Sequence, residues 1–294
     1  MNESAQTEPK ELLLPERKWG DAISEMGLRP DDIRTKKLQA FLPHIPVNSG
    51  MPVPWTVAQC LKALNHLEIT DDEKKLIAET VTAEADAEIL EPYGTLLTSL
   101  IREGGRRAAT IISLGCGGEG RMERVLADRI RKDKDLASVD VKWIGLETSD
   151  KRTDTSFFRD AGNEFVVKRP MDNPHYADLI SDNSLKLMIA NFSYHHLGRG
   201  FTNFLAQCKG LERVVLLEQP VTRKQWEDPV HRTAKIAYDV LMNAGLDPEW
   251  IAQASNNPDL FKVSYLLEEE IPKGSDVTRF PKVVPGCALI DFKP

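Results

Sequence analysis

The chain has 294 residues, of which 41% are hydrophobic and 28% are charged, and its net charge is -7. This length allows one core domain of about 200 residues with an appendage, and the composition is that of an ordinary globular protein. The negative charge argues against a nucleic-acid partner, because the phosphate backbone attracts a basic face.

The sequence has no feature of a membrane protein or of a disulfide-rich secreted protein. No apolar run approaches the ~20 residues that span a bilayer, and residues 1–20 lack the apolar centre of a signal peptide. The four cysteines lie far apart and match neither a disulfide framework nor the spacing of a zinc site. We therefore expect a cytoplasmic protein with no metal and no membrane partner.

The first 95 residues carry helical patterns and no strand pattern. Residues 31–42 and 56–67 have apolar residues at helical spacing, and the prolines between them favour an extended linker. Thr70 and Glu73 form a capping box that opens a further helix. Residues 1–95 are thus predicted to form a helical cap. It is either a packing arm or a lid over a ligand, and periodicity does not distinguish the two.

A strand, a glycine turn and a helix follow one another in the next part of the chain. The apolar run at 110–114 ends in glycines, and residues 121–130 have apolar side chains at three- and four-residue steps. This order is typical of the first half of a doubly wound nucleotide-binding unit. Gly115 permits the tight turn, Gly117 lets the backbone approach a ligand, and Gly120 lets the helix start pack on the strand.

Six further segments are predicted to be strands. Four apolar segments, separated by helix-length stretches that suit parallel crossovers, lie at 139–147, 165–167, 187–190 and 214–217. Two more lie at 261–271 and 283–292, and we expect these to pair antiparallel because no helix fits between them. The predicted fold of residues 96–294 is therefore α/β: a doubly wound, Rossmann-like, mostly parallel seven-stranded sheet with a terminal antiparallel pair.

The residues that follow these strands carry a resemblance to a known family. Residues 114–120 are similar to the first glycine motif of the class I S-adenosylmethionine-dependent methyltransferases. Glu147 matches the ribose-binding acid of that family, and Asp172 lies where the family often contacts the adenine ring. Residues 191–197 resemble the family's segment beside the sulfonium centre. These matches extend over residues 110–294 and imply the family's fold.

The sequence departs from the family pattern in two places. Family members usually carry an acid two residues before the first glycine, and this chain has Ser113. Enzymes that methylate nucleobase amino groups often have two prolines inside the segment that here runs from Asn191 to Tyr194. The missing prolines and the negative charge disfavour nucleobase methylation.

The resemblance implies a site for S-adenosylmethionine at the strand ends. Its cofactor-binding residues would be Gly115, Cys116, Gly117, Gly120, Glu147, Asp172, Asn191, Ser193 and Tyr93. A carboxylate at a strand end holds ribose hydroxyls well, and Glu147 can supply it. The spacing from Gly115 to Glu147 is 147 − 115 = 32 residues, which is longer than the ~20 residues typical of dinucleotide binders. If these acids have no role in binding, Glu147 is an exposed acid at a strand end, and Asp172, which precedes Asn-Pro, is a turn residue. Tyr93 is placed where a lid residue reaches the cofactor's carboxylate.

Four residues near this site are candidates for catalysis: His195, His196, Tyr194 and Tyr176. The sulfonium is already a good electrophile, so the reaction mainly requires in-line positioning and, for a protonated acceptor, a base. Histidine titrates near neutrality and can serve as that base, or it can simply hydrogen-bond the loop backbone. The tyrosines either contact the substrate or belong to the core.

The resemblance implies a biosynthetic methyltransferase that acts on a small-molecule acceptor. One alternative keeps the cofactor but attacks its aminocarboxypropyl carbon, as azetidine-2-carboxylate synthases do, and releases methylthioadenosine. Another alternative is a non-catalytic S-adenosylmethionine-binding protein. The sequence leaves the acceptor and the oligomeric state open.

Overall fold

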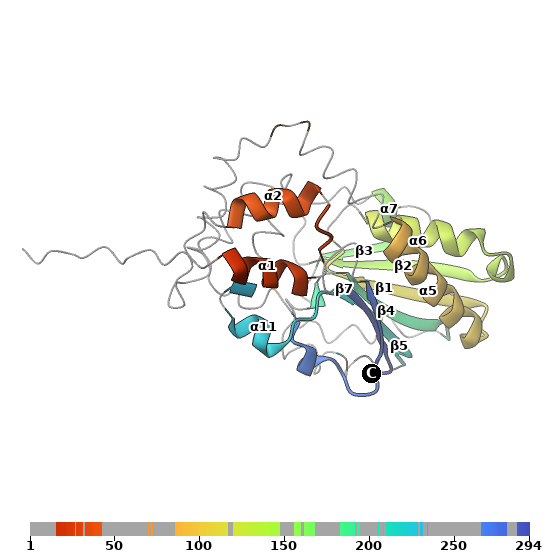
Figure 1. Ribbon diagram of the computed structural model, residues 1–294. Coiled ribbons are helices and arrows are strands. Elements are labelled where there is room, and N and C mark those ends of the chain that lie inside the picture. The colour runs from red at the N-terminus through yellow and green to blue at the C-terminus, as the bar shows by residue number, and fades with distance from the viewer. Residues whose placement is uncertain are drawn as a thin grey trace, which may run out of the picture. The chain divides into compact units, whose positions relative to one another are not determined.

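The computed structural model describes the sheet, the helices beside it and part of the N-terminal region. Figure 1 shows this part in colour, and its residues are 16–26, 28–31, 33–42, 70, 72, 86–116, 120–147, 156–159, 162–167, 183–191, 193–194, 205, 208, 210–228, 230–231, 234, 266–280 and 287–294. The chain forms two compact units. The helical unit comprises Met1–Val81 and Thr222–Lys262, and the sheet unit comprises Thr82–Val221 and Val263–Pro294.

The sheet unit is built on one mixed sheet. Its strands are β1 (Ala108–Leu114), β2 (Asp140–Glu147), β3 (Glu164–Val167), β4 (Leu185–Asn191), β5 (Arg213–Glu218), β6 (Asp276–Phe280) and β7 (Cys287–Phe292). In the described residues they form seven strands in the order β3-β2-β1-β4-β5-β7-β6. Strands β1 to β5 pair in parallel, and β7 pairs antiparallel with both β5 and β6. The α/β class and the mostly parallel sheet are confirmed.

The strand order reverses at β1, which lies between β2 and β4. In the ladders Leu114 of β1 is opposite both Leu146 of β2 and Ala190 of β4, so these three strands end at the same level. The residues that follow them form one edge, here called the carboxyl edge. Ligands of open α/β sheets bind outside the carboxyl ends of the strands at such a reversal point.

The terminal antiparallel pair exists, but the described part of the strand predicted at 261–271, residues 266–271, forms no strand of the sheet, and residues 261–265 lie outside the described residues. Glu268–Glu270 form a short 3-10 helix (η5), and β6 begins at Asp276, between the two segments predicted to be strands. Gly274, with a φ of 82°, and Ser275 belong to the turn that precedes the strand. Four of the five β6 residues are exposed, so the strand lacks the apolar alternation by which strands are detected.

The helices of the sheet unit are α5 (Glu91–Gly104), which continues from η2 (Asp86–Leu90), α6 (Arg121–Lys132) and α7 (Ser156–Arg159). A proline in its first turn favours the start of α5, and Gly105, in the left-handed conformation, ends it. The predicted domain boundary between residues 95 and 96 falls inside α5, all of which belongs to the sheet unit. None of the helices in the described ranges is long and apolar enough to cross a membrane.

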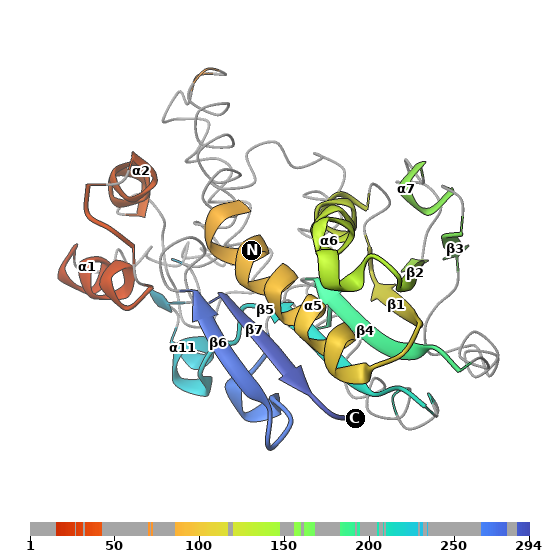
Figure 2. The same ribbon diagram turned by 90° about the vertical axis from the view of Figure 1, so that its right-hand side faces the viewer.

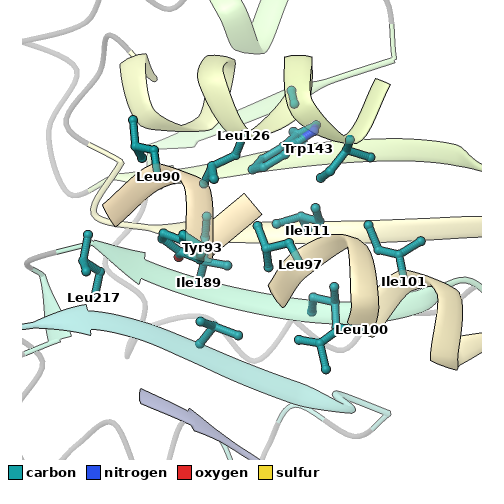
Figure 3. Packing of buried hydrophobic residues seen from close by; sticks show 14 of the residues in the cluster. Leu90, Tyr93, Leu97, Leu100, Ile101, Ile111, Leu126, Trp143, Ile189 and Leu217 are labelled. Carbon is teal, nitrogen blue, oxygen red and sulfur yellow. The ribbon is translucent and has the colours of Figure 1, made fainter. Parts of the chain in front are cut away.

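Helices α5 and α6 cover one face of the sheet (Figure 2). Figure 3 shows Tyr93 and Leu97 of α5 and Leu126 of α6 packed over Ile111 of β1 and Ile189 of β4. The alternate residues of the same strands fill a second cluster on the other face. Because successive strand residues point to opposite faces, the odd-numbered residues of β1 and β4 all face α5 and α6.

Two aromatic side chains of the short helix α7, Phe157 and Phe158, pack against the sheet. A Cβ atom built on Gly120 would lie 2.9 Å from the ring of Phe158, and one built on Gly145 would lie 2.8 Å from it. Gly120 therefore makes room for α7. Trp143 and Phe157 extend the cluster through an edge-to-face contact with ring centroids 5.8 Å apart.

Changing Gly145 to alanine is expected to lower the free energy of unfolding by ~1–3 kcal/mol, because the new methyl group overpacks against Phe158. Urea unfolding followed by circular dichroism measures this. The control is Gly20→Ala in the exposed middle of a helix of the other unit, where no atom lies within 4 Å of the added carbon. That change should raise stability by ~0.5–1 kcal/mol, since alanine favours helix over glycine. A destabilisation at Gly20 as large as that at Gly145 would contradict the steric argument.

The helical unit contains α1 (Glu16–Glu25), α2 (Ile33–Phe41) and α11 (Arg223–Glu227) among its described residues. Helix α2 confirms the prediction at 31–42, α1 was not predicted, and the predicted helix at 56–67 lies outside the described residues. His231 lies between two carboxylates, with Nε2 2.5 Å from Glu25 and Nδ1 3.1 Å from Asp228. This contact joins α1 to the chain that follows β5, so the unit has a second segment that the sequence did not reveal.

Candidate functional site

The turn after β1 is fixed by contacts to both neighbouring strands. Gly115 has a φ of 60°, and its N–H donates to the Leu146 carbonyl at 2.8 Å. Ser193 Oγ donates to the Leu114 carbonyl at 2.6 Å, and a Cβ atom on Gly115 would lie 2.5 Å from Ser193 Cβ. The glycine is thus required both by its left-handed conformation and by the approach of the segment after β4. The tight turn predicted at Gly115 is confirmed.

Beside this turn, a buried network of polar side chains joins four elements. Glu123 Oε1, on α6, accepts hydrogen bonds from Ser113 Oγ of β1 at 2.6 Å and from Asn191 Nδ2 of β4 at 3.2 Å. The Asn191 side-chain carbonyl accepts a hydrogen bond from the Tyr93 hydroxyl of α5 at 2.9 Å. The network therefore fixes the ends of β1 and β4 relative to α5 and α6, directly at the carboxyl edge.

The carboxyl group at the centre of this network is almost sealed from water. Glu123 is 2% exposed, and burial raises its pKa, although the hydrogen bonds from Ser113 and Asn191 oppose that rise. Tyr93 is fully buried, and its pKa is raised well above 10 by burial and by the charge of Glu123. The Tyr93 hydroxyl therefore keeps its proton and acts as a donor to Asn191.

The raised pKa of Glu123 makes stability depend on pH in a defined direction. A carboxyl group whose pKa is raised in the folded state stabilises the fold at pH values below its ordinary pKa of about 4.5. This contribution is lost as the pH rises through the folded-state pKa. Wild-type protein should therefore lose more stability from about pH 5 to about pH 8 than a Glu123→Gln variant, which cannot ionise. Urea unfolding at both pH values tests this. Parallel pH profiles for the two proteins would contradict it.

A second buried carboxylate holds the segment after β4 from the other side. Glu218, the last residue of β5, is 1% exposed, and its Oε1 accepts the backbone N–H of Tyr194 at 2.7 Å. Tyr194 is half-buried, and its pKa is raised by burial and by the charges of Glu270 and Glu218. At neutral pH the Tyr194 phenol is therefore protonated.

The structure brings together many of the residues predicted for the site. Those at the carboxyl edge or in the turn and segment beside it are Gly115, Cys116, Gly120, Glu147, Asn191, Ser193 and Tyr194. Glu147 ends β2 and is half-buried. The others lie outside the described residues, so their roles stay predictions: Gly117, Asp172, Tyr176, His195 and His196. The part of the chain that the structure describes holds no group of three or more His, Cys, Asp or Glu side chains that could bind a metal ion.

Tyr93 has a different place from the one expected of a lid residue. It lies in the core of the sheet unit, inside α5, and reaches the carboxyl edge only through Asn191. Glu123 was not predicted, whereas the sequence already placed Glu218 at the end of the fifth predicted strand, at the same edge of the sheet. A signal for Glu123 existed, because it shares a helical face with Leu126, Ala127 and Ile130, all of which are buried.

Comparisons with known proteins give only distant likenesses. No family model and no curated protein matches the chain. Similar solved structures include the citrinin polyketide synthase CMeT domain, at 13% identity and a TM-score of 0.44, covering 76% of this chain and 58% of that one. The plantazolicin methyltransferase BpumL, crystallised with SAH, has 11% identity, a TM-score of 0.41 and coverages of 90% and 87%. SCL7 of Oryza sativa has 10% identity, a TM-score of 0.46 and coverages of 98% and 96%. At these TM-scores the likenesses carry no argument about function.

Proposed function

We propose that the chain is a methyltransferase of the class I S-adenosylmethionine-dependent fold that acts on a small-molecule acceptor. The observation that carries this is the carboxyl edge, where the glycine turn, Glu147 and Asn191 meet at the reversal point of the sheet. In the dinucleotide-binding order 3-2-1-4-5-6 the sixth strand lies beside the fifth. Here the antiparallel β7 separates β5 from β6, which agrees with the predicted methyltransferase fold and disfavours a dinucleotide dehydrogenase.

The charges at the carboxyl edge support a cationic ligand. Glu123, Glu147 and Glu218 bring three carboxyl groups from α6, β2 and β5 to this edge. Carboxylates repel a pyrophosphate and attract a sulfonium and an ammonium group. S-adenosylmethionine carries both cations, so the residues present fit it better than they fit a dinucleotide.

In the proposed roles, Glu147 accepts hydrogen bonds from the ribose hydroxyls, and the turn at Gly115 and Cys116 lies along the rest of the cofactor. Asn191 and Ser193 line its reactive end, and Asp172 contacts the adenine ring. Bound S-adenosylmethionine supplies an activated methyl group. The protein's task is then to align the acceptor and, where the acceptor is protonated, to remove its proton.

His195 and His196 are our proposed bases, and Tyr176 and Tyr194 are proposed to orient the acceptor. The helical N-terminal region is proposed to act as a cap that shapes the acceptor pocket. These assignments rest on the sequence, where the segment after β4 lies beside the reacting carbon in the family that the chain resembles.

The nucleoside products distinguish the possible reactions. Purified protein is incubated with S-adenosylmethionine, with and without a pool of small acceptors, and the products are identified by chromatography and mass. We expect S-adenosylhomocysteine with the pool and little turnover without it. Methylthioadenosine released from the cofactor alone would instead indicate attack on the aminocarboxypropyl carbon, and no product in either reaction would indicate a binding protein.

A further inference from the structure

The acid that is missing before the glycine turn has a counterpart on the neighbouring helix. Ser113 stands where the family resemblance implies a carboxylate on β1. The Ser113 hydroxyl donates its hydrogen bond to Glu123 at 2.6 Å, so a carboxyl group from α6 lies directly beside the end of β1. In this chain the strand therefore supplies the hydroxyl, and the helix supplies the carboxyl group.

The buried carboxyl has no cationic partner in the described part of the chain. Its contacts there are the hydroxyl of Ser113, the amide of Asn191 and its own backbone N–H, and the nearby ionisable group is the phenol of Tyr93. None of these groups carries a positive charge at neutral pH. A carboxylate sealed from water without a positive partner is costly, so its ionised form favours the arrival of a cation.

The network also fixes where this charge acts. Asn191 lies at the carboxyl edge, half-buried, with its carbonyl held by Tyr93 and its amide held by Glu123. Glu123 itself is 2% exposed, so it affects a ligand at this edge through its electric field rather than by direct contact. At an effective dielectric constant of about 20, two unit charges about 7 Å apart interact strongly enough to change affinity roughly 10- to 50-fold.

We propose that Glu123 is the anion by which this site selects a positively charged ligand, held on α6 in place of the acid absent from β1. The inference rests on the proposed function, in which the ligand is S-adenosylmethionine and its sulfonium and ammonium groups carry the positive charge. Glu123 is therefore a specificity-determining residue that acts without touching the ligand.

The test compares two ligands on three proteins by titration calorimetry. S-adenosylmethionine is cationic, whereas 5′-methylthioadenosine shares its adenosine part and is neutral. Glu123→Gln keeps the shape and the acceptor oxygen for Ser113 and Asn191 but removes the charge. The matched control is Asp128→Asn, which removes a charge from the same helix at a side chain that is 51% exposed.

Glu123→Gln should weaken binding of S-adenosylmethionine roughly 10-fold or more and leave binding of 5′-methylthioadenosine within about 2-fold of wild type. Asp128→Asn should change neither affinity. Equal effects of Glu123→Gln on both ligands, or no effect on either, would overturn this inference and leave the proposed function standing. A wild-type protein that does not bind S-adenosylmethionine would instead overturn the proposed function, and this inference with it.

A swap variant keeps the test decisive if Glu123→Gln does not fold. Ser113→Asp combined with Glu123→Ser moves the carboxyl onto β1 and the hydroxyl onto α6, so the pair remains complementary. We expect this double variant to keep the preference for the cationic ligand, since the charge stays at the same junction. Loss of that preference in a folded swap variant would overturn the proposal.

Discussion

Replacing Gly115 with alanine is expected to lower the free energy of unfolding by roughly 2–5 kcal/mol and to abolish tight ligand binding. The left-handed backbone, with a φ of 60°, accounts for ~1–2 kcal/mol of this cost in a residue with a Cβ atom. The rest arises because that atom would lie 2.5 Å from Ser193 Cβ and force β1 and the segment after β4 apart. Urea unfolding measures the stability, and calorimetry with S-adenosylmethionine measures the binding.

Gly105→Ala is the matched control for this prediction. Gly105 has a φ of 59°, almost the same as Gly115, but no atom lies within 4 Å of the position of its added carbon. Gly105→Ala should therefore lower the free energy of unfolding only by the backbone cost of ~1–2 kcal/mol and leave binding unchanged. Equal destabilisation at the two glycines would contradict the argument that Ser193 requires a glycine at position 115.

Replacing Glu147 with alanine should weaken binding of S-adenosylmethionine roughly 10- to 100-fold, because hydrogen bonds to a charged group contribute ~1.5–3 kcal/mol. The motivation is the position of Glu147, which ends β2 level with the glycine turn of β1. Titration calorimetry on a variant with an unchanged unfolding midpoint measures the effect.

The control for this change is Glu164→Ala. Glu164 begins β3, the strand next to β2, so it lies at the opposite end of the strand from the carboxyl edge. Its carboxylate forms an ion pair with Lys142, with 3.0 Å between Oε2 and Nζ. Glu164→Ala removes the same type of side chain from the same sheet, but away from the carboxyl edge, so we expect it to leave the affinity unchanged. If both variants lose affinity to the same extent, the loss reflects net charge, and the assignment of Glu147 to the ribose is wrong.

The elements that the sequence revealed are those whose apolar pattern is dictated by burial. β1, β2, β4 and β5 are covered on both faces, so each appears as an apolar run that ends at a polar or glycine residue. The glycine turn was predictable for a related reason, since Gly115 terminates an apolar strand just before a helix. Because these strands were predicted to be parallel, the residues at their carboxyl ends, Glu147 and Asn191, were expected at the same edge of the sheet.

The features that escaped prediction depend on contacts between distant segments. β6 is exposed along most of its length, so nothing in its own sequence distinguishes it from a loop. Glu123 accepts hydrogen bonds from Ser113 and Asn191, and only the folded sheet brings these three residues together. Tyr93 is 98 residues from Asn191, and no local pattern predicts that hydrogen bond.

The central claim is that the carboxyl edge binds S-adenosylmethionine and not a dinucleotide. The most direct test is a pair of calorimetric titrations of one wild-type preparation, first with S-adenosylmethionine and then with NAD. We expect saturable binding of S-adenosylmethionine at one site per chain and no measurable binding of NAD, because the edge carries carboxyl groups from three elements. Saturable binding of NAD by a protein that ignores S-adenosylmethionine would contradict it.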